Sequence, residues 1–169
     1  MTENGEKAIE TLKKLGIEFE MAVHAPAFTM EGCAEAEEKL GAPMCKNLFL
    51  TNRQMTDFYL LLIPGDKPFK TKYLSAQLGV SRLSFGSGEQ MESLLGCAPG
   101  SASVMGALFD TAHRVRILLD AEVAAGEYIL CHPCENDASL KIKTADILTK
   151  FLPHTGHDYT VVTLPREVE

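Results

Sequence analysis

The segment 47–63, NLFLTNRQMTDFYLLLI, contains two apolar runs separated by polar residues. Residues 47–51 and 58–63 are rich in leucine and aromatic side chains, whereas residues 52–57 include the Asn, Thr and Asp that are typical of a turn. This pattern predicts a β-hairpin, and the apolar character of both runs places it at the centre of a sheet. The turn signal Pro64-Gly65-Asp66 follows and closes the unit.

Helical and strand patterns alternate irregularly around this hairpin. Helical spacing of apolar residues, or a capping residue before an apolar run, predicts helices at residues 8–15, 33–40, 71–78, 87–95 and 145–152. Strand patterns occur at residues 17–24, 115–119, 127–130, 140–142 and 159–164. Thr71 and Thr144 are expected to be N-caps, and Ser87 with Gln90 matches a capping box.

The order of these elements predicts the fold class. Hairpins mixed with isolated helices, without a steady strand–helix alternation, are typical of an α/β protein of the α+β type. We expect a mixed, mostly antiparallel, curved or barrel-like sheet with helices packed outside. No internal repeat or linker interrupts the chain, so residues 1–169 are expected to form a single domain. A doubly wound nucleotide-binding fold is disfavoured, because Gly86-Ser87-Gly88 lacks the third glycine of a dinucleotide fingerprint.

Composition limits the classes of function. With 46% hydrophobic and 23% charged residues, the chain is an ordinary globular protein. Its apolar runs are too short for a bilayer and its first residues are polar and acidic, so we expect a cytoplasmic protein with no membrane partner. The net charge of −7 argues against a broad nucleic-acid surface but leaves room for a small basic mouth that grips one strand end. The basic residues available for it are Lys67, Lys70, Lys72, Arg82, Arg114, Arg116, Lys141 and Lys143.

The five cysteines show no spacing typical of a disulfide framework, so reduced thiols are expected. We interpret Cys33, Cys45 and Cys97 as small, mostly buried apolar residues.

The segment 131–136, CHPCEN, has two interpretations. Its C-x-x-C pair can be a redox dithiol, or half of a zinc site completed by His154 and His157. Its H-P-x-x-N residues instead describe a rigid turn suited to holding a small substrate beside backbone N–H donors. A turn and a strand pattern, not a helix, follow Cys134, and the spacing of the histidines departs from the usual zinc-finger pattern.

Two other segments indicate a ligand site. Lys46-Asn47 opens an apolar strand, where the lysine is either a solvated flank or a rigidly held cation for an anionic group. The loop 99–106 is rich in small residues that let backbone approach a ligand, although it can equally be an ordinary connection. Asp110, just beyond, can orient a partner or turn the chain.

The polar residues of the CHPCEN turn have their own alternatives. His132 is either a general base or a core imidazole with satisfied hydrogen bonds. Asn136 offers donors and an acceptor but is also a common turn residue.

Taken together, the motifs resemble those of the bacterial prolyl-tRNA editing family, whose fold also occurs as an insertion domain of prolyl-tRNA synthetases. The likeness covers most of the chain. It rests on KNLFL at 46–50, LLIPGDK at 61–67, RLSF at 82–85, Leu95-Gly96 with Pro99-Gly100, His132-Pro133 with Asn136, and FLPHTGH at 151–157.

The resemblance implies an ester hydrolase that acts in trans on mischarged proline tRNA at its 3′ adenosine. The segments 46–50 and 154–157 look most like the freestanding deacylases that remove alanine, and a cysteine-specific deacylase of the same family is the alternative. The implied partners are the tRNA 3′ aminoacyl end and prolyl-tRNA synthetase. No cofactor and no metal ligand are expected, because a reactive ester needs only positioning, an oxyanion site and water.

The resemblance also assigns roles to residues. Lys46 would contact the 3′-end phosphate or ribose, and Asn47 would fix the chain beside it. The turn 132–136 would bound the aminoacyl pocket, and the loop 100–106 would cover it. The expected catalytic residues are Lys46, His132 and Asn136. The expected substrate-binding residues are Asn47, Gly100, Ser101, Ser103, Met105, Gly106, Asp110 and Pro133.

Two departures from the family pattern affect the pocket wall. Leu130-Cys131 replaces a glycine–aromatic pair, and Met105 replaces an aromatic residue. These departures bear on which amino acid the pocket accepts and not on the class of reaction. Two other hypotheses remain open, a catalytically inert module that binds tRNA ends or a synthetase, and a zinc- or thiol-dependent protein.

Overall fold

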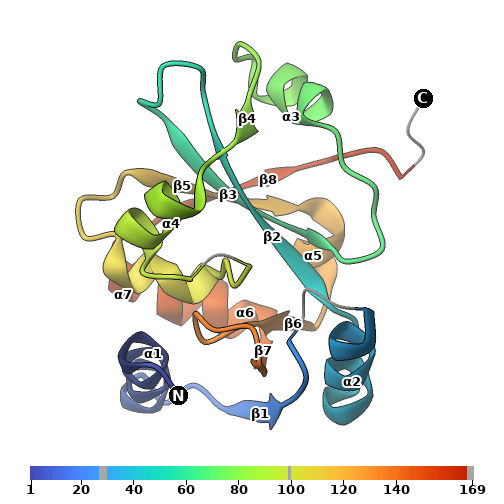
Figure 1. Ribbon diagram of the computed structural model, residues 1–169, viewed down its shortest axis with the longest axis vertical. Helices are drawn as coiled ribbons and strands as arrows, with labels where there is room; N and C mark the ends of the chain where they lie inside the picture. Colours follow the sequence, from blue (N-terminus) through green and yellow to red (C-terminus); the bar gives the residue numbers. More distant parts are fainter. Residues whose placement is uncertain (27–29, 99, 167–169) are drawn as a thin grey trace.

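The computed structural model describes residues 1–26, 30–98 and 100–166, and its strands form two sheets (Figure 1). The five-stranded sheet has the order β4-β2-β3-β5-β8, and the three-stranded sheet has the order β1-β7-β6. The strands are β1 (Phe19–Val23), β2 (Cys45–Thr51), β3 (Phe58–Pro64), β4 (Ser84–Phe85), β5 (Val115–Asp120), β6 (Tyr128–Cys131), β7 (Ala138–Lys143) and β8 (Tyr159–Val162).

The predicted hairpin lies at the centre of the larger sheet. β2 and β3 pair antiparallel from Cys45 opposite Pro64 to Thr51 opposite Phe58. β5 and β8 add parallel strands beyond β3, whereas the smaller sheet is antiparallel throughout. The mixed, mostly antiparallel character is therefore confirmed, but the strands divide between two sheets and do not close into one barrel.

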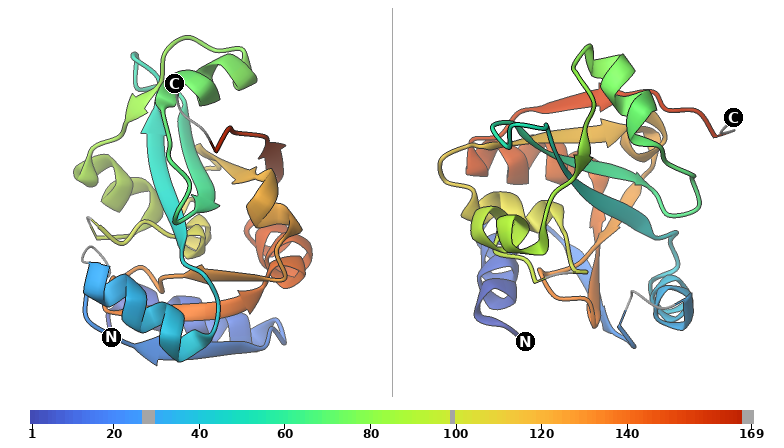
Figure 2. Two further views of the ribbon diagram at one scale, coloured as in Figure 1. Left: turned by 90° about the vertical axis from the view of Figure 1, so that its right-hand side faces the viewer. Right: turned by 45° about the horizontal axis from the view of Figure 1, so that its top comes forward.

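Helices surround and connect the sheets, as Figure 2 shows. No helix within the described residues is both long and apolar enough to span a membrane. The helices are α1 (Glu3–Lys14), α2 (Met30–Leu40), α3 (Thr71–Leu78), α4 (Gly88–Leu95), the 3₁₀ helix η1 (Val104–Phe109), α5 (Ala121–Ala125), α6 (Thr144–Asp146), the π-helical η2 (Ile147–Phe151) and α7 (Leu152–Thr155).

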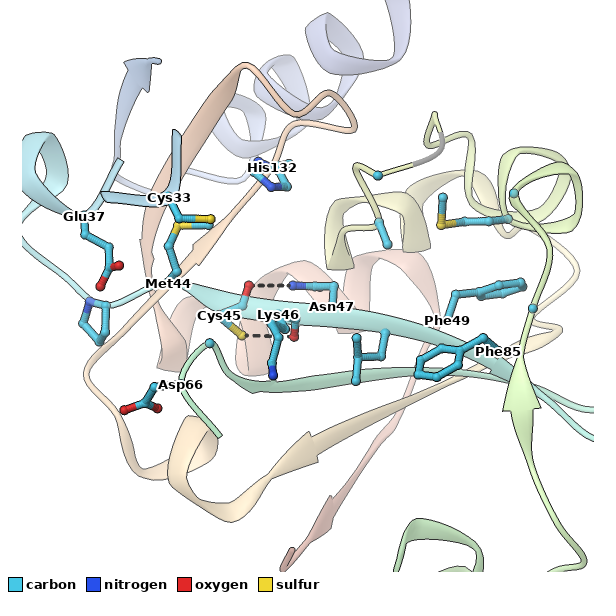
Figure 3. A pocket seen from close by; sticks show the side chains of 18 of the residues that line it. Cys33, Glu37, Met44, Cys45, Lys46, Asn47, Phe49, Asp66, Phe85 and His132 are labelled. Carbon is cyan, nitrogen blue, oxygen red and sulfur yellow. Dashed lines mark hydrogen bonds between the residues drawn. The ribbon is translucent and has the colours of Figure 1, made fainter. Parts of the chain in front are cut away.

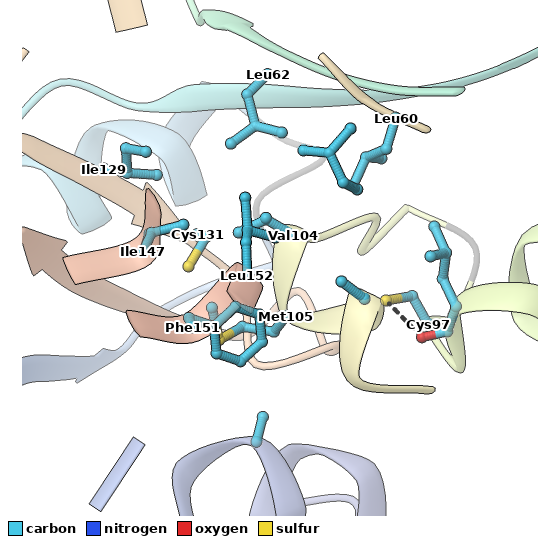
Figure 4. Packing of buried hydrophobic residues seen from close by; sticks show 14 of the residues in the cluster. Leu60, Leu62, Cys97, Val104, Met105, Ile129, Cys131, Ile147, Phe151 and Leu152 are labelled. Carbon is cyan, nitrogen blue, oxygen red and sulfur yellow. Dashed lines mark hydrogen bonds between the residues drawn. The ribbon is translucent and has the colours of Figure 1, made fainter. Parts of the chain in front are cut away.

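Both faces of the larger sheet are buried. One face, with Leu60 and Leu62 of β3, packs against the smaller sheet, η1 and η2 (Figure 4). The other face, with Leu61 and Ile63, packs against Leu74 of α3. Burial on both faces explains why β3 is a continuous apolar run and does not alternate.

The capping predictions have mixed outcomes. The capping box of Ser87 and Gln90 is present at the start of α4. Thr71 and Thr144 are not N-caps, because the extended residue before each helix is a lysine and each threonine is the first helical residue. The Thr144 hydroxyl is buried and finds no hydrogen-bond partner among the described residues.

The cysteines differ in their surroundings. Cys97, Cys131 and Cys134 are buried, and Cys33 and Cys45 are partly buried. Burial raises the pKa of the Cys131 thiol, and a hydrogen bond with Cys97 together with burial raises that of Cys134. Thiols with raised pKa values are poor nucleophiles, which does not favour a redox role for this pair. The described residues contain no group of three His, Cys, Asp or Glu side chains placed to hold a metal ion.

Asp110 holds the chain between η1 and β5. Its carboxylate is 3% exposed and accepts hydrogen bonds from the N–H groups of Arg114, at 3.0 Å, and Val115, at 2.8 Å. Nε2 of His157 lies 2.9 Å from the same carboxylate, so the C-terminal HTGH segment is joined to this turn. These contacts agree with the alternative that Asp110 turns the chain.

Replacing Asp110 by Ala is expected to lower the free energy of unfolding by about 3 kcal/mol, because it leaves buried donors without an acceptor. Urea unfolding followed by circular dichroism measures the change. The exposed Asp158→Ala is the matched control and should stay within about 0.5 kcal/mol of the unsubstituted protein. Equal stability of the two variants would contradict this account.

Candidate functional site

A cavity of about 740 Å³ lies along the first half of β2 (Figure 3). β2 pairs with β3 along its whole length, but on its other edge it pairs with β4 only at Leu50 and Thr51. One further bond runs from the Gly86 N–H to the Phe49 carbonyl. Because backbone groups alternate in direction along a strand, Asn47 directs its N–H and C=O to the same open edge as Phe49. Among the described residues, no strand pairs with this edge of β2 at Asn47, and the cavity lies beside it.

Lys46 lines the cavity with its charged end held in place. Side chains alternate along β2, so Lys46 leaves the strand on the face opposite to Asn47 and extends to the side where Asp66 lies (Figure 3). Its Nζ donates to the Lys67 carbonyl at 2.7 Å. Burial lowers the pKa of the ammonium below the ordinary lysine value, and attraction to Asp66 partly offsets this. An ammonium has three N–H donors, so one bond to a carbonyl leaves donors for an anionic ligand.

Asn47 connects β2 to the loop before η1. Its amide oxygen accepts from the Val104 N–H at 3.0 Å, and its amide nitrogen donates to the Cys45 carbonyl at 3.4 Å. Two serines extend the connection, because the Ser101 hydroxyl donates to the Cys134 carbonyl at 3.0 Å and the Ser103 hydroxyl donates to the His132 carbonyl. The structure therefore brings the loop, the CHPCEN turn and Asn47 together.

His132 lines the cavity, and a hydrogen bond holds its ring in place. A carbonyl can only accept, so the 2.8 Å bond between Nδ1 and the Ala138 carbonyl puts the proton of the neutral ring on Nδ1. Burial lowers the pKa of the imidazole, and the bond to Ala138 acts in the opposite direction. The neutral ring then presents Nε2 as an acceptor.

The other expected site residues fall into two groups. Gly100 lines the cavity together with Lys46, Asn47 and His132. The second group is buried or half-buried and does not line it; its members are Ser101, Ser103, Met105, Gly106, Asp110, Pro133 and Asn136. Met105 packs in the core, and a Cβ on Gly106 would lie 2.7 Å from the Leu95 carbonyl oxygen. The small residues of this loop therefore serve close packing as well as ligand approach.

Several cavity residues were missed from the sequence. They are Phe85 of β4, Gly86, the N-cap Ser87 and the first residue Gly88 of α4, Cys33 and Glu37 of α2, and Ala102. Phe85 is 60% exposed, and Gly86 fits closely against Phe49, since a Cβ there would lie 2.3 Å from the ring. The RLSF segment was a usable signal, but the exposure of its aromatic residue depends on how β4 pairs.

None of the basic residues named as candidates for a basic mouth is among the described residues that line the cavity. Lys67 is 3% exposed, so it is buried and does not belong to a rim. Arg114 and Arg116 lie over the Phe58 and Tyr59 rings. Lys141 lies over Tyr128 beside a separate hollow. Arg53 and Arg82 line a second hollow that shares Phe85 and Ser87 with the cavity.

Comparisons with known proteins agree with this architecture. The family model of the aminoacyl-tRNA editing domain matches residues 24–150. The chain is 31% identical over 156 residues to a zebrafish (Danio rerio) protein named prolyl-tRNA synthetase associated domain-containing protein 1, covering 91% of this chain and 84% of the relative. It is 26% identical over 156 residues to the prolyl-tRNA editing protein ProX of Acetoanaerobium sticklandii, covering 92% and 94%.

A solved structure shows the same fold. The crystal structure described as that of a candidate trans-editing enzyme for prolyl-tRNA synthetase superposes with a TM-score of 0.72 at 15% identity, over 98% of this chain and 99% of that one. The matched family model includes β2, the loop before η1 and the CHPCEN turn, which together line the cavity. The chain therefore belongs to the aminoacyl-tRNA editing domain family.

Proposed function

We propose that residues 1–169 act as one editing domain that hydrolyses the ester of mischarged proline tRNA, with alanine as the amino acid removed. The observation that carries the proposal is the position of Lys46. In a chain of the editing family, its ammonium is fixed by a carbonyl at the mouth of a cavity lined by open strand backbone. A fixed cation beside free backbone donors suits a ligand with a phosphate and a reactive carbonyl.

The proposed reaction requires little activation of the substrate. An aminoacyl ester is already reactive, so holding it beside water and donors for the oxyanion supplies most of the required acceleration. The backbone N–H group of Asn47, at the open edge of β2, is a suitable oxyanion donor. His132 presents Nε2 as an acceptor for a water or ribose proton. Lys46 binds the phosphate or ribose of the terminal nucleotide.

The proposed amino acid is alanine. Its support comes from the KNLFL segment, of which residues 46–49 line the cavity. The HTGH segment does not line the cavity, since its His157 contacts Asp110. A pocket sized for alanine excludes proline by its size but admits glycine or serine in part. Prolyl-tRNA synthetase is the proposed supplier of the substrate, which places the reaction in the cytoplasm with translation.

The first test compares proline tRNA charged with alanine, cysteine or proline, using purified protein treated with a chelator. Alanine is expected to be released about 100-fold faster than proline. Faster release of cysteine would reassign the pocket to the cysteine-specific alternative. Binding without release of any amino acid would replace the hydrolase with an inert tRNA-binding module.

Replacing Lys46 by Ala is expected to lower kcat/KM by about 10- to 100-fold, because a charged hydrogen bond to the substrate is lost. The change should leave the melting temperature nearly unaltered. Lys13→Ala, an exposed lysine on α1, is the matched control and should keep full activity. Full activity in the Lys46 variant would remove the proposed role of this residue.

The rate is expected to fall as the pH rises through the pKa of Lys46, which lies below the ordinary value of about 10.4. The charged form is needed for binding, so activity is present below that pKa and lost above it. Single-turnover rates between pH 7 and pH 10, corrected for spontaneous hydrolysis, measure the profile. Lys46→Arg should remove the fall, because arginine stays charged. An unchanged alkaline limb in that variant would assign the fall to another group.

A further inference from the structure

The turn after β3 ends in a lysine that is buried. The Lys67 side chain is 3% exposed, and its Nζ lies 2.8 Å from Asp120 Oδ2 and 2.7 Å from Glu122 Oε2. Asp120 is fully buried at the end of β5. A buried ammonium is tolerated only when it is paired and hydrogen-bonded, so these contacts fix where Lys67 can lie.

The two carboxylates are themselves held. The other Asp120 oxygen accepts from the Glu122 N–H at 2.9 Å at the start of α5. Arg166 donates to Glu122 through Nη2 at 2.6 Å and Nε at 2.9 Å. Burial alone lowers the pKa of Lys67, but its bonds to Asp120 and Glu122 raise it above the ordinary value, so the ammonium stays charged. The cluster is a connected set of charged hydrogen bonds with its acceptors satisfied.

The backbone of the same turn reaches the candidate site. The Lys67 carbonyl accepts from the Lys46 ammonium at 2.7 Å. The turn is tied to β2 by the Gly65 N–H, which donates to the Met44 carbonyl at 2.8 Å, and the Lys67 N–H donates to the Pro64 carbonyl at 3.0 Å. Lys67 thus contacts a buried ion-pair partner through its side chain and the Lys46 ammonium through its carbonyl.

We propose that Lys67 and Asp120 are positioning residues: their buried ion pair holds the Lys67 carbonyl where it orients the Lys46 ammonium toward the substrate. The inference rests on the proposed function, in which Lys46 binds the tRNA end. A free lysine has many rotamers, and ordering it on binding costs affinity. A carbonyl fixed by the ion pair orders Lys46 before the substrate arrives. Neither Lys67 nor Asp120 lines the cavity, so both act through Lys46.

The test removes both charges at once, with Lys67→Met and Asp120→Asn. Removing one partner alone would strand a buried charge, whereas the asparagine oxygen can still accept from the Glu122 N–H. The double variant is expected to raise KM for alanyl-tRNA, and Kd for uncharged proline tRNA, by about 10-fold, with kcat changed less than about 2-fold. The Lys141→Met and Glu20→Gln pair removes a distant ion pair and should leave both constants unchanged.

The decisive comparison repeats the charge removal in the Lys46→Ala background. If the ion pair acts through Lys46, removing the pair causes no further loss of affinity in the Lys46→Ala background, so the effects of the two changes are not additive. If the pair only supports the fold, the two losses multiply, and this result would overturn the proposal, as would an unchanged KM and Kd in the first variant. Melting temperatures of all variants separate loss of folded protein from loss of binding.

A milder variant serves if the double variant does not fold. Glu122→Gln removes one partner of Lys67 at the exposed side of the cluster. It should raise Kd for proline tRNA about 3-fold in the presence of Lys46 and not in the Lys46→Ala background; an equal rise in both backgrounds, or none in either, overturns the proposal. Because Kd is measured with uncharged tRNA, these results stand even if the protein hydrolyses no ester. Failure of the proposed hydrolysis and failure of the positioning role are thus distinguished.

Discussion

The incomplete pairing of β2 determines where the site lies. Its whole length is bonded to β3, but β4 reaches only Leu50 and Thr51. The first half of the strand therefore keeps an open edge, which would normally attract another strand. Here the cavity, bordered by Gly100, Ala102 and His132, occupies that edge. The backbone N–H groups at this edge of β2, and the side chains that line the cavity, are therefore accessible to a ligand.

Each face of the open strand has its own rigid support. On one face, Asn47 bonds to Val104, and Ser101 and Ser103 tie the loop to the CHPCEN turn. On the other face, the Lys67 carbonyl holds the ammonium of Lys46. The proposed reaction acts on an already reactive ester, so it depends mainly on placing groups accurately. Buried and satisfied polar contacts provide that accuracy, which explains why many of the expected site residues support the cavity instead of lining it.

The features of the fold that depend on local sequence pattern could be predicted from the sequence. The hairpin, the capping box at Ser87 and most of the helices and strands followed from the apolar period and the turn residues, whereas the short elements β4, η1 and α5 were not predicted. The sequence did not predict the division into two sheets, since strand pairing depends on contacts distant in the chain. Lys67 was counted among the candidates for a basic rim because its partner Asp120 is 53 residues away and cannot be recognised from the local sequence. Phe85 was missed as a cavity residue because its exposure depends on how β4 pairs with β2. Lys46, Asn47 and His132, which line the cavity, stand in local motifs that the sequence displays.

The location of the site is tested most directly by NMR titration of the chain with an adenosine whose 3′ ester to alanine is replaced by a stable amide. The account predicts that the largest shifts of backbone amide signals occur at residues 45–49 and 86–88, with signals near Tyr128 and Lys141 unmoved. Those two residues line the separate hollow on the smaller sheet. Shifts confined to that hollow would contradict the assignment of the open edge of β2 as the substrate site.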